Sequence, residues 1–155
     1  MSETLIRTVP VKLDVGAHVP ALVETARQFN AAATWVARVC CVSMATDREG
    51  ITNTNTAHHR VYGETRASFG LGAQLAVCAR AKAMEAIKAT RAKGSDTCPA
   101  FDPTGAVRYD ARTYRLLPLD GVSLNTMQGR VTCRLVPGQR QRDMLLDADW
   151  VIGGG

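Results

Sequence analysis

The sequence predicts an α+β fold, in which a small β barrel or curled sheet has its first strand separated from the other strands by a helical insert. Three observations predict it: a segment with strand periodicity near the N-terminus, long helical-period segments in the middle, and several short strand-like segments after Gly94. The chain has 155 residues, 46% of them hydrophobic, which is enough for one domain with a hydrophobic core.

The first predicted strand covers residues 5–15. Its apolar side chains share one parity, interrupted only by Arg7, and are Leu5, Val9, Val11, Leu13 and Val15. This is the period of a strand with one buried face. Pro10 removes one backbone donor, so the strand is expected at a sheet edge or at a bulge.

A long helix is predicted over residues 20–44. Its apolar residues recur at intervals of three and four, at Leu22, Ala26, Phe29, Ala33, Val36 and Cys40. Residues 47–58 are rich in turn formers and predict a loop.

Two further helices are predicted, a short one over residues 59–68 and a long one over residues 71–93 that ends at Gly94. In the second of these, Arg80, Lys88 and Arg91 lie within about 80° of one another on a helical wheel, in a sector that also holds Met84. This sector can be a solvated face or a face that contacts phosphates.

Short strands are predicted over residues 107–110, 113–117, 122–124 and 130–136, with turn signals at residues 120–121 and 128–129. Aromatic residues make up 5% of the chain. Phe29, Trp35, Phe101 and Trp150 are therefore expected as packing anchors. The five cysteines form no Cys-x-x-Cys pair, so the sequence favours a reduced chain, with Cys40 and Cys41 in the core.

The formal charge of +5 and the pI near 9.2 indicate an anionic partner. Every basic residue between Val107 and Asp143 is an arginine: Arg108, Arg112, Arg115, Arg130, Arg134, Arg140 and Arg142. Guanidinium groups bind phosphate in a bidentate way and stack on bases, which favours nucleic acid. A GC-rich genome would also replace Lys by Arg without a functional cause.

Several phrases, taken in order, resemble the N-terminal half of transposon-encoded TnpB proteins and of type V CRISPR effector nucleases. They are VPVKLDV at 9–15, TARQFNAAATWV at 25–36, LGAQLAVCARAKAMEAIKA at 71–89, PAF at 99–101, VRYDARTYRLL at 107–117 and VSLNTMQGRV at 122–131. The resemblance covers nearly the whole chain. It resides in the order of the phrases, because none of them is specific alone.

The resemblance implies a wedge domain, an oligonucleotide-binding-type barrel, interrupted by a helical recognition insert. Residues 1–15 would form the first strand of the wedge, 16–95 the insert, and 96–155 the remaining strands, incomplete at the C-terminus. The wedge would grip the scaffold of a guide RNA. Wedge and insert together would hold double-stranded target DNA at a short flanking motif, while base pairing reads the sequence.

The resemblance also implies site residues. Gln74 matches a helix position that faces the flanking-motif duplex, where its amide could bond an adenine edge; it could equally be a solvent-facing residue. Tyr109, Arg112 and Thr113 match a strand-turn-strand that borders nucleic acid, although Tyr109 could equally belong to the core. The candidate nucleic-acid-binding residues are Gln74, Arg80, Lys88, Arg91, Arg108, Tyr109, Arg112, Thr113, Arg115, Arg130 and Arg134.

No catalytic or metal-binding residue is assigned to this chain. In the family, Mg²⁺-dependent cleavage belongs to an RNase-H-like domain, which requires several converging carboxylates and is expected in cis or on another chain. The chain is thus expected to be a non-catalytic binding module with no cofactor of its own. Two alternatives are one part of a split RNA-guided endonuclease, and a basic assembly protein without guide RNA whose arginines scatter over all faces.

The expected location is the bacterial cytoplasm, at the nucleoid when the chain is bound to DNA. No stretch of the sequence predicts a membrane span. A homodimer through an unpaired strand edge near Trp150 and Ile152 is a further possibility.

Overall fold

The computed structural model describes residues 4–46, 53–117 and 121–151, with the backbone alone for residues 42–46. In order, the elements are β1 (Lys12–Asp14), a 3-10 turn η1 (Gly16–His18), α1 (Val19–Thr46), α2 (Thr54–Phe69), α3 (Ala73–Ala92), β2 (Tyr114–Leu117), β3 (Gly121–Thr126), β4 (Gly129–Val136) and α4 (Gln139–Leu146). The predicted α+β class is confirmed.

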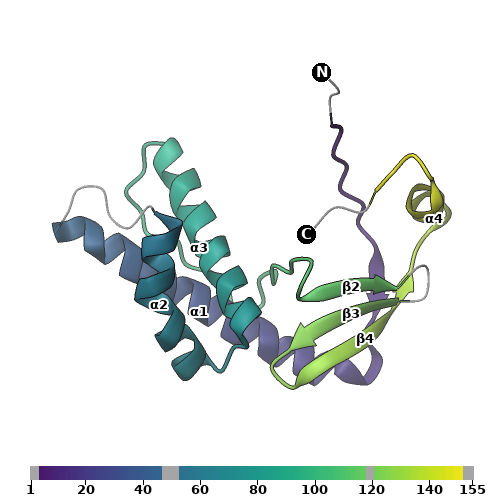
Figure 1. Ribbon diagram of the computed structural model, residues 1–155, viewed down its shortest axis with the longest axis horizontal. Coiled ribbons are helices and arrows are strands. Elements are labelled where there is room, and N and C mark those ends of the chain that lie inside the picture. Colours follow the sequence, from purple (N-terminus) through teal and green to yellow (C-terminus); the bar gives the residue numbers. More distant parts are fainter. Residues whose placement is uncertain (1–3, 47–52, 118–120, 152–155) are drawn as a thin grey trace.

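The molecule has a helical part and a sheet part, which α1 connects (Figure 1). α2 and α3 pack on the C-terminal part of α1, while the N-terminal part of α1 lies behind the sheet (Figure 1). Leu22, at the end of the first turn of α1, packs into the core of the sheet. One helix thus belongs to both hydrophobic cores and fixes the sheet against the helices.

The predicted helix over residues 20–44 is confirmed as α1. Its stripe of apolar residues forms the centre of the helical core, where Phe29, Ala33 and Val36 are fully buried. Phe29 belongs to the same buried cluster as Leu75 and Ala79 of α3. Cys40 is buried beside Met84, as expected for a core cysteine. Trp35 and Phe101 are half-buried against this cluster.

The second helix begins earlier than predicted. Asn53 caps α2, because its side-chain Oδ1 accepts hydrogen bonds from the backbone N–H groups of Asn55 and Thr56. Residues 54–58 are therefore helical, and the prediction of a loop there is wrong; residues 47–52 lie outside the described part. Gly70, at φ 66°, ends the helix in the left-handed conformation.

The four strands pair only antiparallel, in the order β1-β4-β3-β2, so β1 and β2 are the edges among the described strands. β1 pairs with β4, with Lys12 opposite Val136 and Asp14 opposite Arg134. The N-terminal strand therefore joins strands that follow it by more than a hundred residues. This pairing shows the predicted arrangement, in which a helical segment separates the first strand from the other strands in the sequence.

The structure around the sheet differs from the prediction in three places: the first strand, residues 107–110 and the helix α4. The first strand has only the three residues of β1, because residues 4–11 pair with no described strand. Residues 107–110 form no strand; they lie in a loop that Tyr109 anchors to the sheet core. The helix α4 was not predicted, because its sequence QRQRDMLL carries no apolar stripe, and no residue of it is buried.

Within the described residues, no helix is long and apolar enough to cross a membrane.

Candidate nucleic-acid interface

The strand register divides the sheet into a buried and an open face, because paired residues of antiparallel strands point to the same side. The buried face carries Leu13, Tyr114, Leu116, Val122, Leu124, Val131, Cys133 and Leu135, which form the sheet core. The open face carries Lys12, Asp14, Arg115, Leu117, Gly121, Ser123, Asn125, Arg130, Thr132, Arg134 and Val136.

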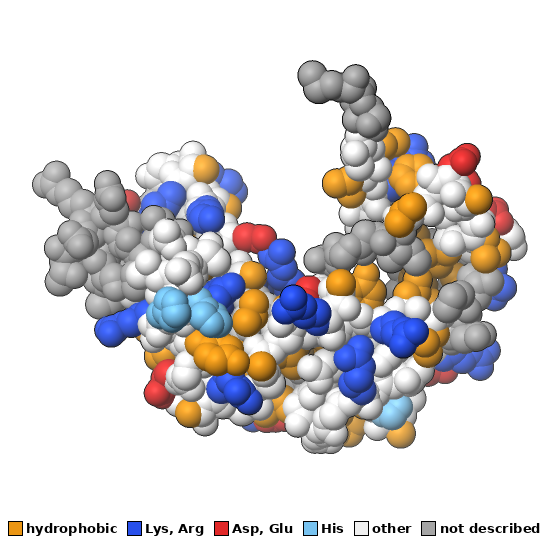
Figure 2. Space-filling view, in the orientation of Figure 1, with side chains coloured by type: hydrophobic (Ala, Val, Ile, Leu, Met, Phe, Trp, Pro, Cys, Tyr) orange, Lys and Arg blue, Asp and Glu red, His pale blue; other side chains and the backbone are white. Residues whose placement is uncertain are grey.

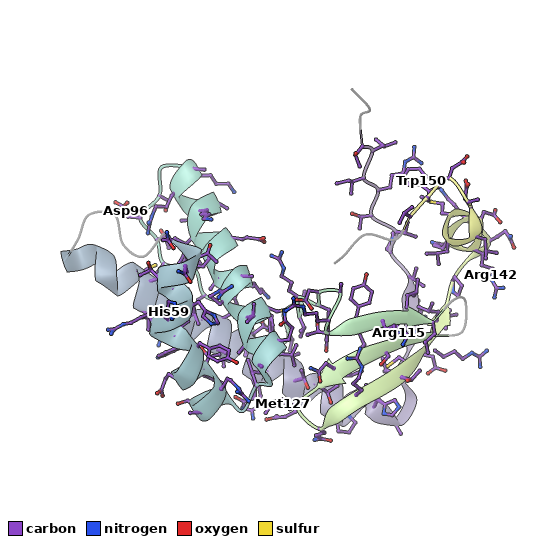
Figure 3. All side chains as sticks on the ribbon, in the orientation of Figure 1. His59, Asp96, Arg115, Met127, Arg142 and Trp150 are labelled. Carbon is purple, nitrogen blue, oxygen red and sulfur yellow. The ribbon has the colours of Figure 1, made fainter. Side chains whose placement is uncertain are left out.

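The open face is basic. Lys12, Arg115, Arg130 and Arg134 are all exposed, and Asp14 is the one acidic residue among the positions of this face. Figure 2 shows Lys and Arg side chains over the sheet and over the adjoining centre of the molecule, and Figure 3 labels Arg115 on the sheet. Residues that lie far apart in the sequence thus form one positively charged surface.

The spacing of the arginines suits separate phosphate groups. Arg130 and Arg134 lie four residues apart on β4, which places their backbones roughly 13 Å apart at the usual rise per strand residue. Arg115 lies two strands away, roughly 10 Å from β4, in the row that holds Ser123 and Thr132. The named positions of this face carry no aromatic ring, so phosphate contact rather than base stacking is the chemistry it offers.

Arg130 is held in position by two hydrogen bonds. Its Nε donates to Ser123 Oγ at 3.0 Å, and its Nη1 donates to the backbone oxygen of Arg112 at 3.3 Å. These bonds direct the guanidinium along the sheet toward the loop before β2. Because the bonds use two of its five N–H groups, the others stay available for an anion.

Asp110 and Gln74 join this loop to α3. Asp110 Oδ1 accepts from the backbone N–H groups of Arg112 and Thr113, and Gln74 Nε2 donates to Asp110 Oδ2 at 2.5 Å. Burial favours the neutral carboxyl, but the hydrogen bonds from Gln74, Arg112 and Thr113 outweigh it, so the pKa of Asp110 lies below its usual value. The network ties the helical part to the sheet and places Arg112 beside Arg130.

Gln74 is thus not a free solvent-facing residue. It is half-buried, its amide nitrogen is bonded to Asp110, and its amide oxygen lies 3.5 Å from Arg112 Nη1. A bidentate contact with an adenine edge would require the amide to leave both partners. The predicted contact with the flanking-motif duplex stays a prediction.

Tyr109 and Thr113 have packing roles. Tyr109 contacts both hydrophobic cores, and its hydroxyl donates to the backbone oxygen of Asn125 at 2.8 Å. Burial raises the pKa of Tyr109 to about 12. Thr113 is fully buried, with its hydroxyl bonded to Asp110. The core alternative for Tyr109 matches this placement, and the Thr113 hydroxyl reaches no surface from which it could contact a phosphate.

Arg108 lies between the sheet part and α3. Its Nη1 is 2.5 Å from Glu85 Oε2, and both side chains are more than a third exposed. An exposed ion pair of this kind contributes about 0–1 kcal/mol to stability. Arg108 can therefore exchange Glu85 for a phosphate at little cost.

The basic residues of α3 do not form a single free face. Met84, in the middle of their sector, is buried in the helical core, and Arg80 Nη1 lies 2.5 Å from His58 Nδ1 of α2. Arg91 is half-buried and Lys88 is exposed. The sector thus packs partly on α2 and partly faces solvent.

Two basic residues that were not among the predicted site residues have clear roles in the structure. Lys12 belongs to the open sheet face. In the predicted first strand it stands between the apolar residues Val11 and Leu13, and this alternation indicates that Lys12 points away from the core. Lys82 is half-buried; its Nζ donates to Asn30 Oδ1 at 2.7 Å and to Ala106 O at 2.6 Å, which fastens the loop before β2 to the helices. Only the tertiary structure reveals that second role.

Among the described residues, no cluster of three or more His, Cys, Asp or Glu side chains is arranged to hold a metal ion. The five cysteines are unbridged. In comparisons with known proteins, the chain matched no protein-family model, no curated protein and no solved structure.

Proposed function

We propose that this chain is a nucleic-acid-binding module, non-catalytic by itself, which holds the guide-RNA scaffold and the flanking motif of the target DNA for an RNA-guided protein of the TnpB and type V effector kind. The observation that carries the proposal is the open sheet face, on which Lys12, Arg115, Arg130 and Arg134 are exposed together. A basic surface with ordered small polar neighbours is suited to a nucleic-acid backbone.

The strand pairing supports the division into wedge and insert. In the proposal, residues 1–15 and 96–155 form the wedge, and residues 16–95 form the recognition insert. β1 pairs with β4 although α1, α2 and α3 lie between them in the sequence. An oligonucleotide-binding-type barrel would require further strands to close the sheet at β1 and β2.

Of the seven arginines from Arg108 to Arg142, Arg108 pairs with Glu85, and Arg140 and Arg142 lie on α4. The other four gather at the open sheet face, which favours this proposal over a basic assembly protein, for which we expect these arginines on all faces. Arg115, Arg130 and Arg134 share one sheet face, and Arg112 is bonded to Arg130 at its margin. In the proposal the chain takes no part in bond cleavage, which belongs to an RNase-H-like domain in cis or in trans.

The test is to sequence the RNA that co-purifies with the chain expressed beside its native flanking DNA. We expect one structured transcript from the adjacent locus, released at high salt because the contacts are mostly electrostatic. The double variant Arg112→Ala/Arg130→Ala should lose it, whereas Arg38→Ala/Lys93→Ala, which removes two exposed charges from the helical part, should retain it. Heterogeneous RNA in all samples would refute guide binding and leave only general affinity for polyanions.

A further inference from the structure

A second feature of interest is a pocket in the helical part, outside the sheet face. A pocket of about 420 Å³ opens between the first two turns of α2 and the N-terminal half of α3, and its lining consists of Thr54, Asn55, His58, Val77 and Arg80. Its volume falls within the range of small-ligand sites. A larger hollow, of about 570 Å³, has Arg66 as its one charged lining residue, and that side chain is exposed and lies over the Tyr62 ring.

The pocket holds a positive charge that no described carboxylate neutralises. The ion pairs among the described residues are Arg27 with Glu24 and Arg108 with Glu85, and none involves Arg80. Arg80 is half-buried, and its Nε is shielded from solvent without a hydrogen-bond partner in the described part of the chain. Because a buried charge and a buried donor both cost free energy without a partner, the site favours an anion.

His58 can increase this charge. Its Nδ1 lies 2.5 Å from Arg80 Nη1, which requires the neutral imidazole to accept from the guanidinium and to carry its proton on Nε2. Burial, Arg80 and His59 together hold the pKa of His58 below its usual value. Arg80 and His59 are the charged neighbours that act on His58. The helix α1 also packs against α2, but its described residues add no charged neighbour of His58.

The backbone donors at the start of α2 do not form the site. The N–H groups of Asn55 and Thr56 already donate to Asn53 Oδ1, and the N–H of Ala57 donates to Asn53 O. The binding chemistry comes instead from the Arg80 and His58 side chains. Thr54 and Asn55, whose side chains are polar, also line the pocket.

We propose that this pocket binds a phosphate group, with the Arg80 guanidinium as the charged donor and the His58 Nε2–H as a second donor. Protonation of His58 at Nδ1 adds a second positive charge and ends the contact with Arg80 Nη1. The proposal that the pocket binds phosphate stands without the proposed function. The proposal that this phosphate belongs to a nucleic-acid backbone rests on the proposed function. Figure 2 shows histidine side chains on the helical part, on the same face as the basic side chains of the sheet, and Figure 3 labels His59 there. One nucleic acid could therefore contact both sites.

The test follows the imidazole resonances of the full chain by NMR while inorganic phosphate, or a short single-stranded RNA, is added at several pH values. A phosphate beside His58 stabilises the imidazolium, so its titration midpoint should rise. The short RNA, whose phosphodiesters keep the same charge over this range, should bind more tightly at pH 5.5 than at pH 8. Arg80→Gln should weaken phosphate binding about tenfold, the usual loss for one charge-assisted hydrogen bond. Arg38→Gln, which removes an exposed guanidinium from α1, is the matched control.

The two additions separate the sources of the phosphate. A His58 response to both supports a subsite for a nucleic-acid phosphate, and a response to inorganic phosphate alone supports a small-anion site while removing the link to the proposed function. If the RNA binds and His58 responds to neither addition, the pocket proposal is overturned and the sheet face stands. Circular dichroism of Arg80→Gln must show native helix content, and Arg80→Lys, which keeps the charge, should restore part of the response.

Discussion

Replacing Arg115, Arg130 and Arg134 by alanine removes three exposed positive charges from the open face of the sheet. Their side chains take no part in the sheet core, so the fold should persist. Each phosphate contact that is lost lowers the slope of log affinity against log salt by about 0.9 for duplex DNA and about 0.7 for a single strand. We therefore expect the triple variant to lose about 2 to 3 from the slope.

The assay is fluorescence anisotropy with a labelled RNA hairpin and a labelled DNA duplex, repeated over a series of salt concentrations. The control variant replaces Arg38, Lys93 and Arg142 by alanine. It changes the net charge by the same amount, but these exposed residues lie on α1, at the end of α3 and on α4 (Figure 3 labels Arg142). The control should keep the slope of the native chain.

An equal loss of slope in both variants would refute the reasoning, because binding would then follow total charge rather than the sheet face. An unchanged slope in the triple variant, with native circular dichroism, would exclude the open face as the contact surface.

Three further predictions concern stability. Phe29→Ala should lower the free energy of unfolding by about 3–5 kcal/mol in urea titrations, because Phe29 is fully buried, whereas Val23→Ala, at a position 59% exposed, should change it little; equal effects would contradict the assigned core. The depressed pKa of Asp110 stabilises the fold above the usual carboxyl pKa, and this contribution is lost as the pH falls through the folded-state pKa. The stability difference between the native chain and Asp110→Asn should therefore narrow below about pH 4, and a difference independent of pH would disprove the role of the charge. Gly121→Ala should lower the melting temperature, because its Cβ would lie 2.6 Å from the backbone oxygen of Cys133; an unchanged melting temperature would show that the two strands separate easily there.

Periodicity in the sequence was sufficient where an element has one continuous apolar face. The stripe from Leu22 to Cys40 predicted α1 to within two residues at each end, and the strands β2 and β4 begin within one residue of their predicted starts. These segments were predictable because their side chains face the core at a fixed interval. The α+β class followed from their order along the chain.

Local patterns failed where stability comes from outside the element. Residues 107–110 have strand-like composition, but Tyr109 instead inserts between the two cores and leaves the loop without a strand partner. In α2, Asn53 caps the helix and adds a turn before its predicted start. That turn is rich in Asn and Thr, and this composition had predicted a loop.

The candidate site shows the same division. The sequence by itself determined that the chain is basic. It also determined that every basic residue from Val107 to Asp143 is an arginine. Only the tertiary structure decided which arginines act together. The register of β2, β3 and β4 places Arg115, Arg130 and Arg134 on one face, and a shift by one residue would turn any of them into the core. The pairing of β1 with β4, which brings Lys12 to this face, joins residues more than a hundred positions apart, so the burial of the sheet core fixes it and no local pattern encodes it.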